Sequence, residues 1–456
     1  MVRRTAFKEP YQWVGNTFLP GVLIATIVVL SAGCAKIDEL RERYTPQSPR
    51  EAYEYGLESS GLSQSAMGIA WFEVGNQALL EPVSPTIPYR EKGYVDPARP
   101  QAVAFYIQLT RGQRFIAHVA FTKPDSGSIF LDLFQELDEL GLGTRRVASA
   151  DSTQSIQFDA DRSGTFLLRL QPELLAGGQY ELSVSTAASV IFPVSGLNSG
   201  AIQSLFGDSR DGGRRSHHGV DIFAPRGTPV IAGTDGVISS TRNGGLGGKT
   251  VWLRSSRTGA SLYYAHLEEQ FVRRGNRVSA GDTLGLVGNS GNARTTPPHL
   301  HFGIYRNGPV DPHPYIFEPD HTLPGIAVEL LEGEVWMRTR IGDSGLYAGP
   351  SRTSEQLMLL EKYTSIHVLA AATSYYRIRL PDGTTGYIRG NQIESETEPI
   401  EQFIMASSAP IQSVPDEFSG TMGLQLRGKS LSIRSRFGEY LRVTTDSGQT
   451  GWILEL

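Results

Sequence analysis

The stretch His299-Leu300-His301-Phe302-Gly303-Ile304-Tyr305 decides the fold of the central part of this 456-residue chain. Polar and apolar side chains alternate at its start, and β-branched and aromatic residues follow, as in a half-buried β-strand. Side chains two positions apart in a strand project from the same face. We therefore expect His299 and His301 to lie side by side on one face, with Leu300 and Phe302 facing a core.

A second histidine motif, Ser216-His217-His218-Gly219-Val220-Asp221, lies earlier in the chain. The glycine and the β-branched residues that follow it disfavour a helix, so we expect an extended backbone. An extended backbone places His217 and Asp221, four positions apart, on one face. His218 then points to the other side.

A third run, Ser261-Leu262-Tyr263-Tyr264-Ala265-His266-Leu267, also has the composition of a strand and brings another histidine. Imidazoles and a carboxylate suit Zn²⁺, and three protein ligands leave a fourth position for water, which is typical of a catalytic zinc. The histidines outnumber the ligands needed, and a spare imidazole can move the protons of amide hydrolysis. These patterns do not choose between His299 and His301 as the third ligand.

Taken together, the three motifs resemble those of the LytM or lysostaphin-like zinc endopeptidases of peptidoglycan. The resemblance covers roughly residues 192–317 and includes HxGxD, Tyr-x-His-Leu and HLH in that order. Flanking matches extend it, and they are Phe206-Gly207, the expected strand 227–232, Gly281-Asp282-Thr283-Leu284-Gly285 and Gly288-Asn289-Ser290-Gly291.

The resemblance implies a role for each residue of the motifs. It makes His217, Asp221 and His301 the ligands of one Zn²⁺ per chain, and His266 and His299 the catalytic pair. It also implies an antiparallel β domain whose substrates are peptidoglycan stem peptides.

Two positions depart from the pattern of the family. Pro297-Pro298 stands where many members have Gly-Pro, and Gly303 stands where a glutamate often follows the phenylalanine. Neither departure removes a ligand or a catalytic imidazole, so we expect them to affect substrate fit. The glycine-rich loop 243–249 is expected to form part of the groove wall, because its glycines let a substrate backbone approach closely.

Composition predicts a multidomain and mainly β protein. The chain has 39% hydrophobic and 20% charged residues, 50 glycines and 26 prolines, which indicates a globular protein rich in turns. The net charge of −5 and the lack of a basic stripe exclude a nucleic-acid partner. Cys34 is the single cysteine, so no internal disulfide framework exists.

The N-terminus has the pattern of a signal peptide over residues 1–33. A charged start is followed by the apolar run Phe18 to Leu30 and by small residues up to Cys34. The end of this segment resembles the lipobox of bacterial lipoproteins, which implies lipidation of Cys34 and a lipid anchor in the membrane. Leu30 lies four residues before the cysteine instead of three, so an uncleaved anchor with an incidental cysteine is the alternative.

The residue after Cys34 indicates which membrane would carry the lipid anchor. Ala35, in place of an aspartate, favours the outer membrane, facing the periplasm. No other segment offers about 18 consecutive apolar residues, so we expect no further membrane span.

Six segments are expected along the chain. Ser48-Pro49-Arg50-Glu51 predicts a helix start, residues 68–80 fit a helix or a strand, and prolines between 82 and 100 predict a linker. The segments are the signal peptide 1–33, a tether with helical and linker parts at 34–100, a β-sandwich resembling pre-peptidase modules at 101–188, the peptidase domain 189–320, and SH3-like domains at 330–398 and 399–456.

An internal repeat defines the two C-terminal segments. Residues 377–388 align without gaps on residues 442–453, and each copy ends as a hairpin. Both copies resemble bacterial SH3-like domains. Their aromatic residues either line a groove for wall or peptide binding or fill two small cores, and they are Tyr375, Tyr376, Tyr387, Tyr440 and Trp452.

Three functions remain compatible with these patterns. The complete set of five site residues favours a zinc endopeptidase acting on peptidoglycan cross-links. The alternatives are a non-catalytic domain that docks and activates a partner wall hydrolase, and an enzyme acting on secreted proteins or bacteriocin-like peptides. Outside this set, His118 is expected to be packed, and three histidines are expected to be satisfied or solvent-facing, namely His218, His313 and His321.

Overall fold

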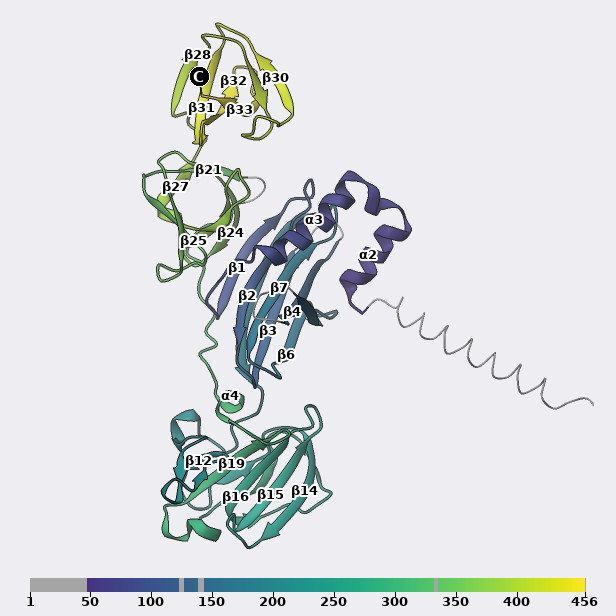
Figure 1. Cartoon of the computed structure of the whole chain (residues 1–456), viewed down its shortest axis with the longest axis vertical. Coiled ribbons are helices and arrows are strands. Elements are labelled where there is room, and N and C mark those ends of the chain that lie inside the picture. The colour runs from purple at the N-terminus through teal and green to yellow at the C-terminus, as the bar shows by residue number, and fades with distance from the viewer. Residues whose placement is uncertain (1–46, 123–126, 138–142, 332–334, 456) are drawn as a thin grey trace, which may run out of the picture. The chain divides into compact units, whose positions relative to one another are not determined.

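The computed structural model describes residues 47–122, 127–137, 143–331 and 335–455 (Figure 1). The predicted signal peptide, the lipidation site Cys34 and the start of the tether lie outside these residues. Among the helices of the described part, none is both long and apolar enough to cross a membrane. The lipid anchor therefore stays a prediction.

The first described helix, α2 (Pro49–Ser59), begins where the sequence predicts. The Ser48 hydroxyl accepts a hydrogen bond from the Glu51 amide at 3.1 Å, and the Glu51 carboxylate accepts one from the Gln47 amide at 2.6 Å. These bonds satisfy amides that a helix start leaves without partners.

The segment that fits a helix or a strand is helical. Helix α3 (Ala66–Leu80) is capped by the Ser65 hydroxyl, which accepts from the Gly68 amide at 3.0 Å. It packs against two strands of the following domain, β2 and β7 (Figure 1). The indole of Trp71 is fully buried there and donates to the Pro172 carbonyl at 2.8 Å.

The sandwich predicted for residues 101–188 is present as two antiparallel sheets around one core. One sheet has the order β2-β7-β4-β5, and β1, β8, β3 and β6 are neighbours in that order in the other. The strands are β1 (Tyr89–Val95), β2 (Val103–Leu109), β3 (Gln113–Thr122), β4 (Ile129–Glu136), β5 (Thr144–Ser149), β6 (Ser155–Asp159), β7 (Gly164–Pro172) and β8 (Gly178–Ala188).

One boundary prediction is wrong, because strand β1 lies inside the predicted linker. β1 pairs with β8 along its whole length. Alternate residues of β1 are buried, but one of the inward positions is Glu91 and another is Gly93. A strand with a charged residue and a glycine on its core face does not show the apolar alternation that sequence reading depends on.

The central domain is built on an antiparallel sheet with the order β17-β14-β15-β16-β19-β12-β9. In this sheet β12 and β16 flank β19, so that Asp221 and Ala265 both lie opposite His301. The strands are β9 (Ile202–Ser204), β12 (Val220–Phe223), β13 (Pro229–Ile231), β14 (Gly236–Asn243), β15 (Lys249–Ser255), β16 (Ser261–Gln270), β17 (Arg277–Val278), β18 (Thr283–Val287), β19 (His299–Tyr305) and β20 (Pro309–Val310).

The core of this domain lies on the face of β19 that the sequence predicts. Leu300 and Phe302 are fully buried in it, with Tyr264 of β16 at 5.3 Å from the Phe302 ring. The opposite face of β19 is therefore free to carry the histidines. The short helix α4 (His313–Ile316) closes the domain.

Two smaller β domains follow, with separate cores. The predicted hairpins are β25–β26 and β32–β33. Four of the five repeat aromatics (Tyr375, Tyr376, Tyr387 and Trp452) are buried, and Tyr440 is partly exposed, which argues against an open groove. Tyr376 lies in the core of the first small domain, but Tyr375 and Tyr387 lie in the core of the sandwich. The strands are β21 (Val335–Thr339), β22 (Ser344–Tyr347), β23 (Gln356–Leu360), β24 (Ser365–Ala372), β25 (Tyr375–Arg379), β26 (Thr385–Arg389), β27 (Ile393–Ser395), β28 (Glu401–Ile404), β29 (Ala409–Gln412), β30 (Thr421–Gln425), β31 (Ser430–Phe437), β32 (Tyr440–Thr445) and β33 (Thr450–Leu454).

The first of these domains is not a separate module. Its strand β24 pairs with β1 of the sandwich, with Lys92 opposite Ala371. The buried guanidinium of Arg377 donates to both carboxylate oxygens of Glu91 at 3.1 Å. The sandwich and this domain therefore share one sheet, a pairing between distant segments that local sequence patterns do not reveal.

Candidate metal centre

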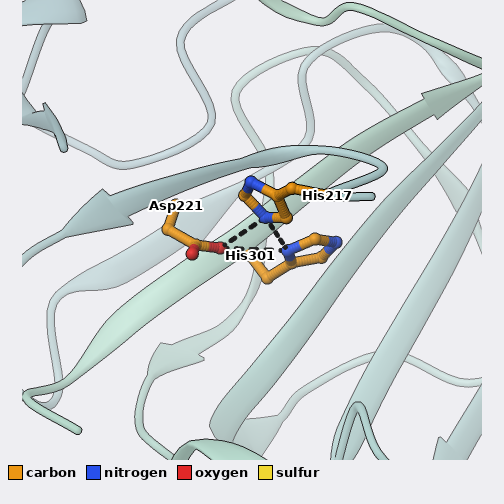
Figure 2. A group of neighbouring side chains, drawn as sticks. All are labelled: His217, Asp221 and His301. Carbon is orange, nitrogen blue, oxygen red and sulfur yellow. Dashed lines mark hydrogen bonds and ion pairs between the residues drawn. The ribbon is translucent and has the colours of Figure 1, made fainter. Parts of the chain in front are cut away.

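Three side chains from two of the predicted motifs converge at the surface of β12 and β19 (Figure 2). His217 Nε2 lies 3.1 Å from Asp221 Oδ1 and 2.9 Å from His301 Nδ1. The third side of this triangle, from His301 Nδ1 to Asp221 Oδ1, measures 3.0 Å. Of the two histidines between which spacing does not choose, the structure brings His301 into this cluster.

The glycine of the first motif makes this convergence possible. A Cβ atom at Gly219 would lie 2.5 Å from the Phe302 carbonyl oxygen and 2.9 Å from His301 Nε2. Such distances are shorter than real Cβ contacts, so any larger residue would push His301 out of place. Antiparallel pairing then sets the register, with Asp221 directly opposite His301.

Hydrogen bonds behind the cluster fix which atoms face its centre. His217 Nδ1 donates to the Leu205 carbonyl at 2.8 Å, which leaves Nε2 as the free nitrogen. Arg210 donates to Asp221 Oδ2 at 2.7 Å, so Oδ1 is the oxygen that faces the two imidazoles. Such outer contacts orient the ligands of metal sites and tune their basicity.

The electrostatics of the cluster favour a charged carboxylate. Burial acts to raise the pKa of Asp221, but the close contacts with His217 and His301 and the positive charge of either ring when protonated outweigh it and hold that pKa well below its usual range. Burial is also the main cause of a lowered pKa for His301. The cluster therefore offers one carboxylate and two largely buried imidazoles.

This donor set fits a zinc ion. Three electron-rich atoms about 3 Å apart repel one another unless a proton or a cation lies between them. Zinc–nitrogen and zinc–oxygen distances near 2.0–2.2 Å in a tetrahedron place neighbouring ligand atoms about 3.3 Å apart, close to the triangle described above. Two histidines and one aspartate are also ligand types that zinc uses.

The other two predicted site residues lie beside the cluster. The rings of His266 and His299 are 5.1 Å apart, and His266 lies 6.0 Å from the ring of His301. His266 Nδ1 donates to the Ser290 carbonyl at 2.8 Å, and His299 Nδ1 donates to the Pro297 carbonyl at 2.9 Å. Each ring therefore keeps Nε2 as its free nitrogen.

The backbone of His266 is strained, with a φ angle of 62°. A residue with a side chain rarely adopts this left-handed conformation, and where it does the surrounding structure must hold it there. The His266 amide donates to the Gly247 carbonyl at 2.9 Å, and the Ser290 hydroxyl holds the next residue by donating to the Leu267 carbonyl at 2.8 Å. The glycine-rich loop thus supports His266.

Burial sets the protonation state of His266. Burial lowers the pKa of His266 to about 4. The hydrogen bond to the Ser290 carbonyl acts to raise this pKa, and the charges of His299 and His301 act to lower it further. The ring is therefore neutral at pH 7 and can accept a proton. On His299, the ring of Phe223 stacks at 5.0 Å and fixes its orientation.

The remaining histidines stay outside the site. His118 is exposed on β3 and lies 3.0 Å from the Ser155 hydroxyl, so the expectation of packing is wrong for this residue. It occupies an outward position of a strand whose neighbours face the core. His218 is exposed, His313 stacks on Phe317, and His321 pairs with Glu318.

Sequence reading missed two kinds of residues at the site. Arg210 contacts a predicted ligand, but it lies seven positions before His217 in a short hairpin with no motif of its own. The other kind is aromatic: Tyr263 lies beside His301, and Trp252 packs against both Tyr263 and Tyr305. Only the alternation in β15, β16 and β19 points to the face that these three residues share.

Comparison with known families agrees with this geometry. The family model described as Peptidase family M23 matches residues 215–312, which contain all three converging residues and the pair beside them. The chain carries a peptidase family M23 domain. Members of this family are zinc-dependent metallopeptidases, which accords with the donor set of His217, Asp221 and His301.

Curated relatives match about a quarter of this chain. The peptidoglycan DD-endopeptidase ShyC of Vibrio cholerae is 39% identical over 94 residues, which cover 21% of this chain and 21% of the relative. The L-Ala--D-Glu endopeptidase of Bacillus subtilis is 36% identical over 138 residues, covering 27% and 42%. The chain thus spans less than half the length of these relatives.

Among solved structures, the catalytic domain of the antimicrobial peptidase lysostaphin from Staphylococcus simulans is 34% identical. The match covers 24% of this chain and 87% of that domain, with a TM-score of 0.22.

Proposed function

We propose that the chain is a zinc-dependent endopeptidase that hydrolyses peptide cross-links of bacterial peptidoglycan. The observation that carries this proposal is the convergence of His217, Asp221 and His301 with two more imidazoles, His266 and His299, beside them. This arrangement combines a cation site with groups that can move protons.

When bound, zinc would supply Lewis-acid chemistry, polarising a carbonyl or a water oxygen. His217, Asp221 and His301 would hold it through the atoms that already face one another. Arg210 keeps the second oxygen of Asp221 occupied, so that one oxygen remains for the metal.

The two remaining histidines would carry the protons. Because the His266 ring is neutral and its Nδ1 is engaged by a carbonyl, it can accept a proton only at Nε2. His299 has the same arrangement at Nδ1. Amide hydrolysis requires one proton to leave the attacking water and one to reach the leaving amine, and a pair of imidazoles can serve both needs.

The names of the relatives support peptidoglycan as the substrate. One relative is called a peptidoglycan DD-endopeptidase and another an L-Ala--D-Glu endopeptidase. The two names refer to different bonds, so they support a peptide bond as the target without naming one bond for this chain.

The predicted signal peptide and Cys34 support a location in the cell envelope. We infer a lipid anchor in the outer membrane with the peptidase domain facing the periplasm, where peptidoglycan lies. The support is the N-terminal sequence pattern with its small residues before Cys34 and Ala35 after it.

Digestion of purified sacculi tests the proposal. Protein lacking residues 1–34 should release muropeptides, detected by mass spectrometry, and a chelator should stop the release. His299→Ala should abolish release while zinc content stays near one ion per chain. Equal release by this variant would overturn the assignment. Lack of cleavage by the zinc-loaded chain, with stimulation of an added wall hydrolase, would establish the docking alternative instead.

A further inference from the structure

Three aromatic rings form a continuous surface next to the metal centre. The Trp252 ring lies 4.4 Å from the Tyr263 ring and 5.0 Å from the Tyr305 ring, and the Tyr263 ring lies 5.8 Å from the ring of His301. All three aromatic side chains are partly exposed. We call these three residues the aromatic shelf.

Strand pairing puts the shelf on the face that carries the site. Trp252 lies opposite Tyr263, and Tyr263 lies opposite Gly303, which is two residues after His301. Residues two apart in a strand share a face, so this row borders the row of His301.

Gly303 gives Tyr305 the room to join the shelf. A Cβ atom at Gly303 would lie 3.0 Å from Tyr305 Cε2 and 3.0 Å from the His218 carbonyl oxygen. The ring of Tyr305 therefore leans over Gly303 toward Trp252. A glutamate, which the family often has at this position, would need the space that Tyr305 occupies.

The polar atoms of the shelf have no protein partners among the residues that the structure describes. Across the described part of the chain, the Tyr263 and Tyr305 hydroxyls and the Trp252 indole N–H make no hydrogen bond. Burial nevertheless raises the pKa of Tyr263 to about 12 and also raises that of Tyr305. Partly buried polar groups without protein partners are expected where a ligand or water supplies the partner.

The cationic side chain of Arg242 lies at one end of the aromatic shelf. Arg242 of β14 is exposed and lies opposite Thr250, two residues before Trp252 on β15. Its charge acts on the Tyr263 phenol, since it opposes the rise of that pKa. Within the described ranges its guanidinium has no ion pair or hydrogen bond. The glycine loop closes the same end, because a Cβ at Gly247 would lie 2.1 Å from the Tyr263 hydroxyl.

We propose that the aromatic shelf and Arg242 bind a side chain of the stem peptide that is aliphatic along its length and ends in a carboxylate. This inference rests on the proposed function and specifies the substrate of the same site. Aromatic faces pack well on methylene groups. Arg242, the indole N–H and the two hydroxyls are all donors, and together they match an anionic end group.

Stem peptides offer a matched pair of probes for this inference. Diaminopimelate at the third position has an aliphatic side chain ending in an ammonium and a carboxylate, whereas lysine lacks the carboxylate. Cross-linked muropeptides of these two types differ at the recognised group. The zinc-loaded full chain, solubilised in detergent, should cleave the diaminopimelate type with the higher kcat/KM.

Variants divide the effect between the two parts of the site. Arg242→Gln should lower kcat/KM for the diaminopimelate type roughly tenfold, as expected for loss of one charge-assisted hydrogen bond, and should not lower it for the lysine type, because the lysine ammonium gains nothing from a neighbouring cation. Tyr305→Leu should raise KM for both types. Arg274→Gln, which removes the same charge from an exposed loop after β16, is the control and should change neither.

Binding measurements separate this inference from the proposed function. In the His299→Ala chain, calorimetry should show tighter binding of the diaminopimelate tetrapeptide than of the lysine tetrapeptide, and Arg242→Gln should remove the difference. Equal binding of both peptides, or tighter binding of peptide-free glycan strands, would overturn the inference. Absence of hydrolysis by the unmodified chain would overturn the proposed function. The difference in affinity between the diaminopimelate and lysine tetrapeptides would still test the role of the aromatic shelf.

Discussion

Two buried polar clusters in this molecule make opposite use of charge. At the metal centre, His217, Asp221 and His301 turn acceptor atoms toward one another at 2.9–3.1 Å. In the shared sheet, Glu91 is fully buried and accepts hydrogen bonds from two arginine nitrogens and two tyrosines. In the first cluster Arg210 pairs with the outer oxygen of Asp221, away from the three facing atoms, whereas in the second cluster Arg377 pairs with both oxygens of Glu91.

This difference separates a site from a structural contact. In the shared sheet, Arg377 neutralises Glu91, and burial together with the carboxylate raises the pKa of Tyr89 and Tyr180, so both phenols stay protonated donors. Every strong group there has a protein partner, which leaves nothing for a ligand. At the metal centre the acceptors meet no strong donor among themselves, so they indicate a bound cation.

The largest effect should follow from removing a metal ligand. His301→Ala takes one of three donors from the cluster, so we expect loss of bound zinc and a fall in muropeptide hydrolysis of about 10³-fold or more. Metal analysis and sacculus digestion measure the two effects. His218→Ala, which removes an exposed histidine next to His217, should change neither. A His301→Ala protein that retains stoichiometric zinc would contradict the assignment.

Breaking the second cluster should reduce stability without affecting zinc. Glu91→Gln leaves the Arg377 guanidinium buried without a charged partner, and the loss of one member of a buried pair costs about 3–5 kcal/mol. Urea unfolding measures this change in the free energy of unfolding. The double variant Glu91→Leu/Arg377→Met should recover much of the loss, because it buries no charge. A Glu91→Gln variant as stable as the parent would show that the pair is dispensable.

A smaller effect is expected from removing the hydrogen bond that Arg210 donates to Asp221. Arg210→Met removes the donor to Asp221 Oδ2, and loss of such an outer contact weakens metal binding by about 10–100-fold. Competition with a chromophoric chelator measures zinc affinity. Arg274→Met, in an exposed loop, serves as the control. Unchanged affinity in Arg210→Met would mean that Asp221 is oriented by its strand alone.

The smallest effect concerns the titration of His266. Its pKa is lowered to about 4, mainly by burial, whereas an unfolded histidine titrates near 6.5. Between these two pH values the unfolded state binds a proton at His266 and the native state does not. The free energy of unfolding therefore falls as the pH drops from about 6.5 to about 4. NMR titration of the imidazole should show a neutral ring down to pH 5. A midpoint near 6.5 would contradict this.

Much of the site was predictable from local patterns. Strand alternation placed His299 and His301 on one face, and the structure shows Leu300 and Phe302 in the core. The helix start at Ser48 and the paired hairpins of the C-terminal repeat were also predictable, because caps and turns depend on residues close in sequence.

Other features required contacts between distant segments. Strand β1 was not predicted because a charged residue, Glu91, lies on its core face. That buried charge requires its ion pair with Arg377, which comes from another domain. Arg210 and the aromatic shelf likewise acquire a role only through neighbours brought together by the sheet.

The sequence by itself determined the ligand types, the strand that carries two of the histidines, the mainly β composition and the candidate lipid anchor. These follow from residue chemistry and from periodicities of a few residues. Only the tertiary structure decided that His301 joins His217 and Asp221, that Ser290 and Pro297 hold the other two rings, and that the sandwich shares a sheet with the domain after the peptidase. The physical reason is that antiparallel register sets distances between residues far apart in the chain.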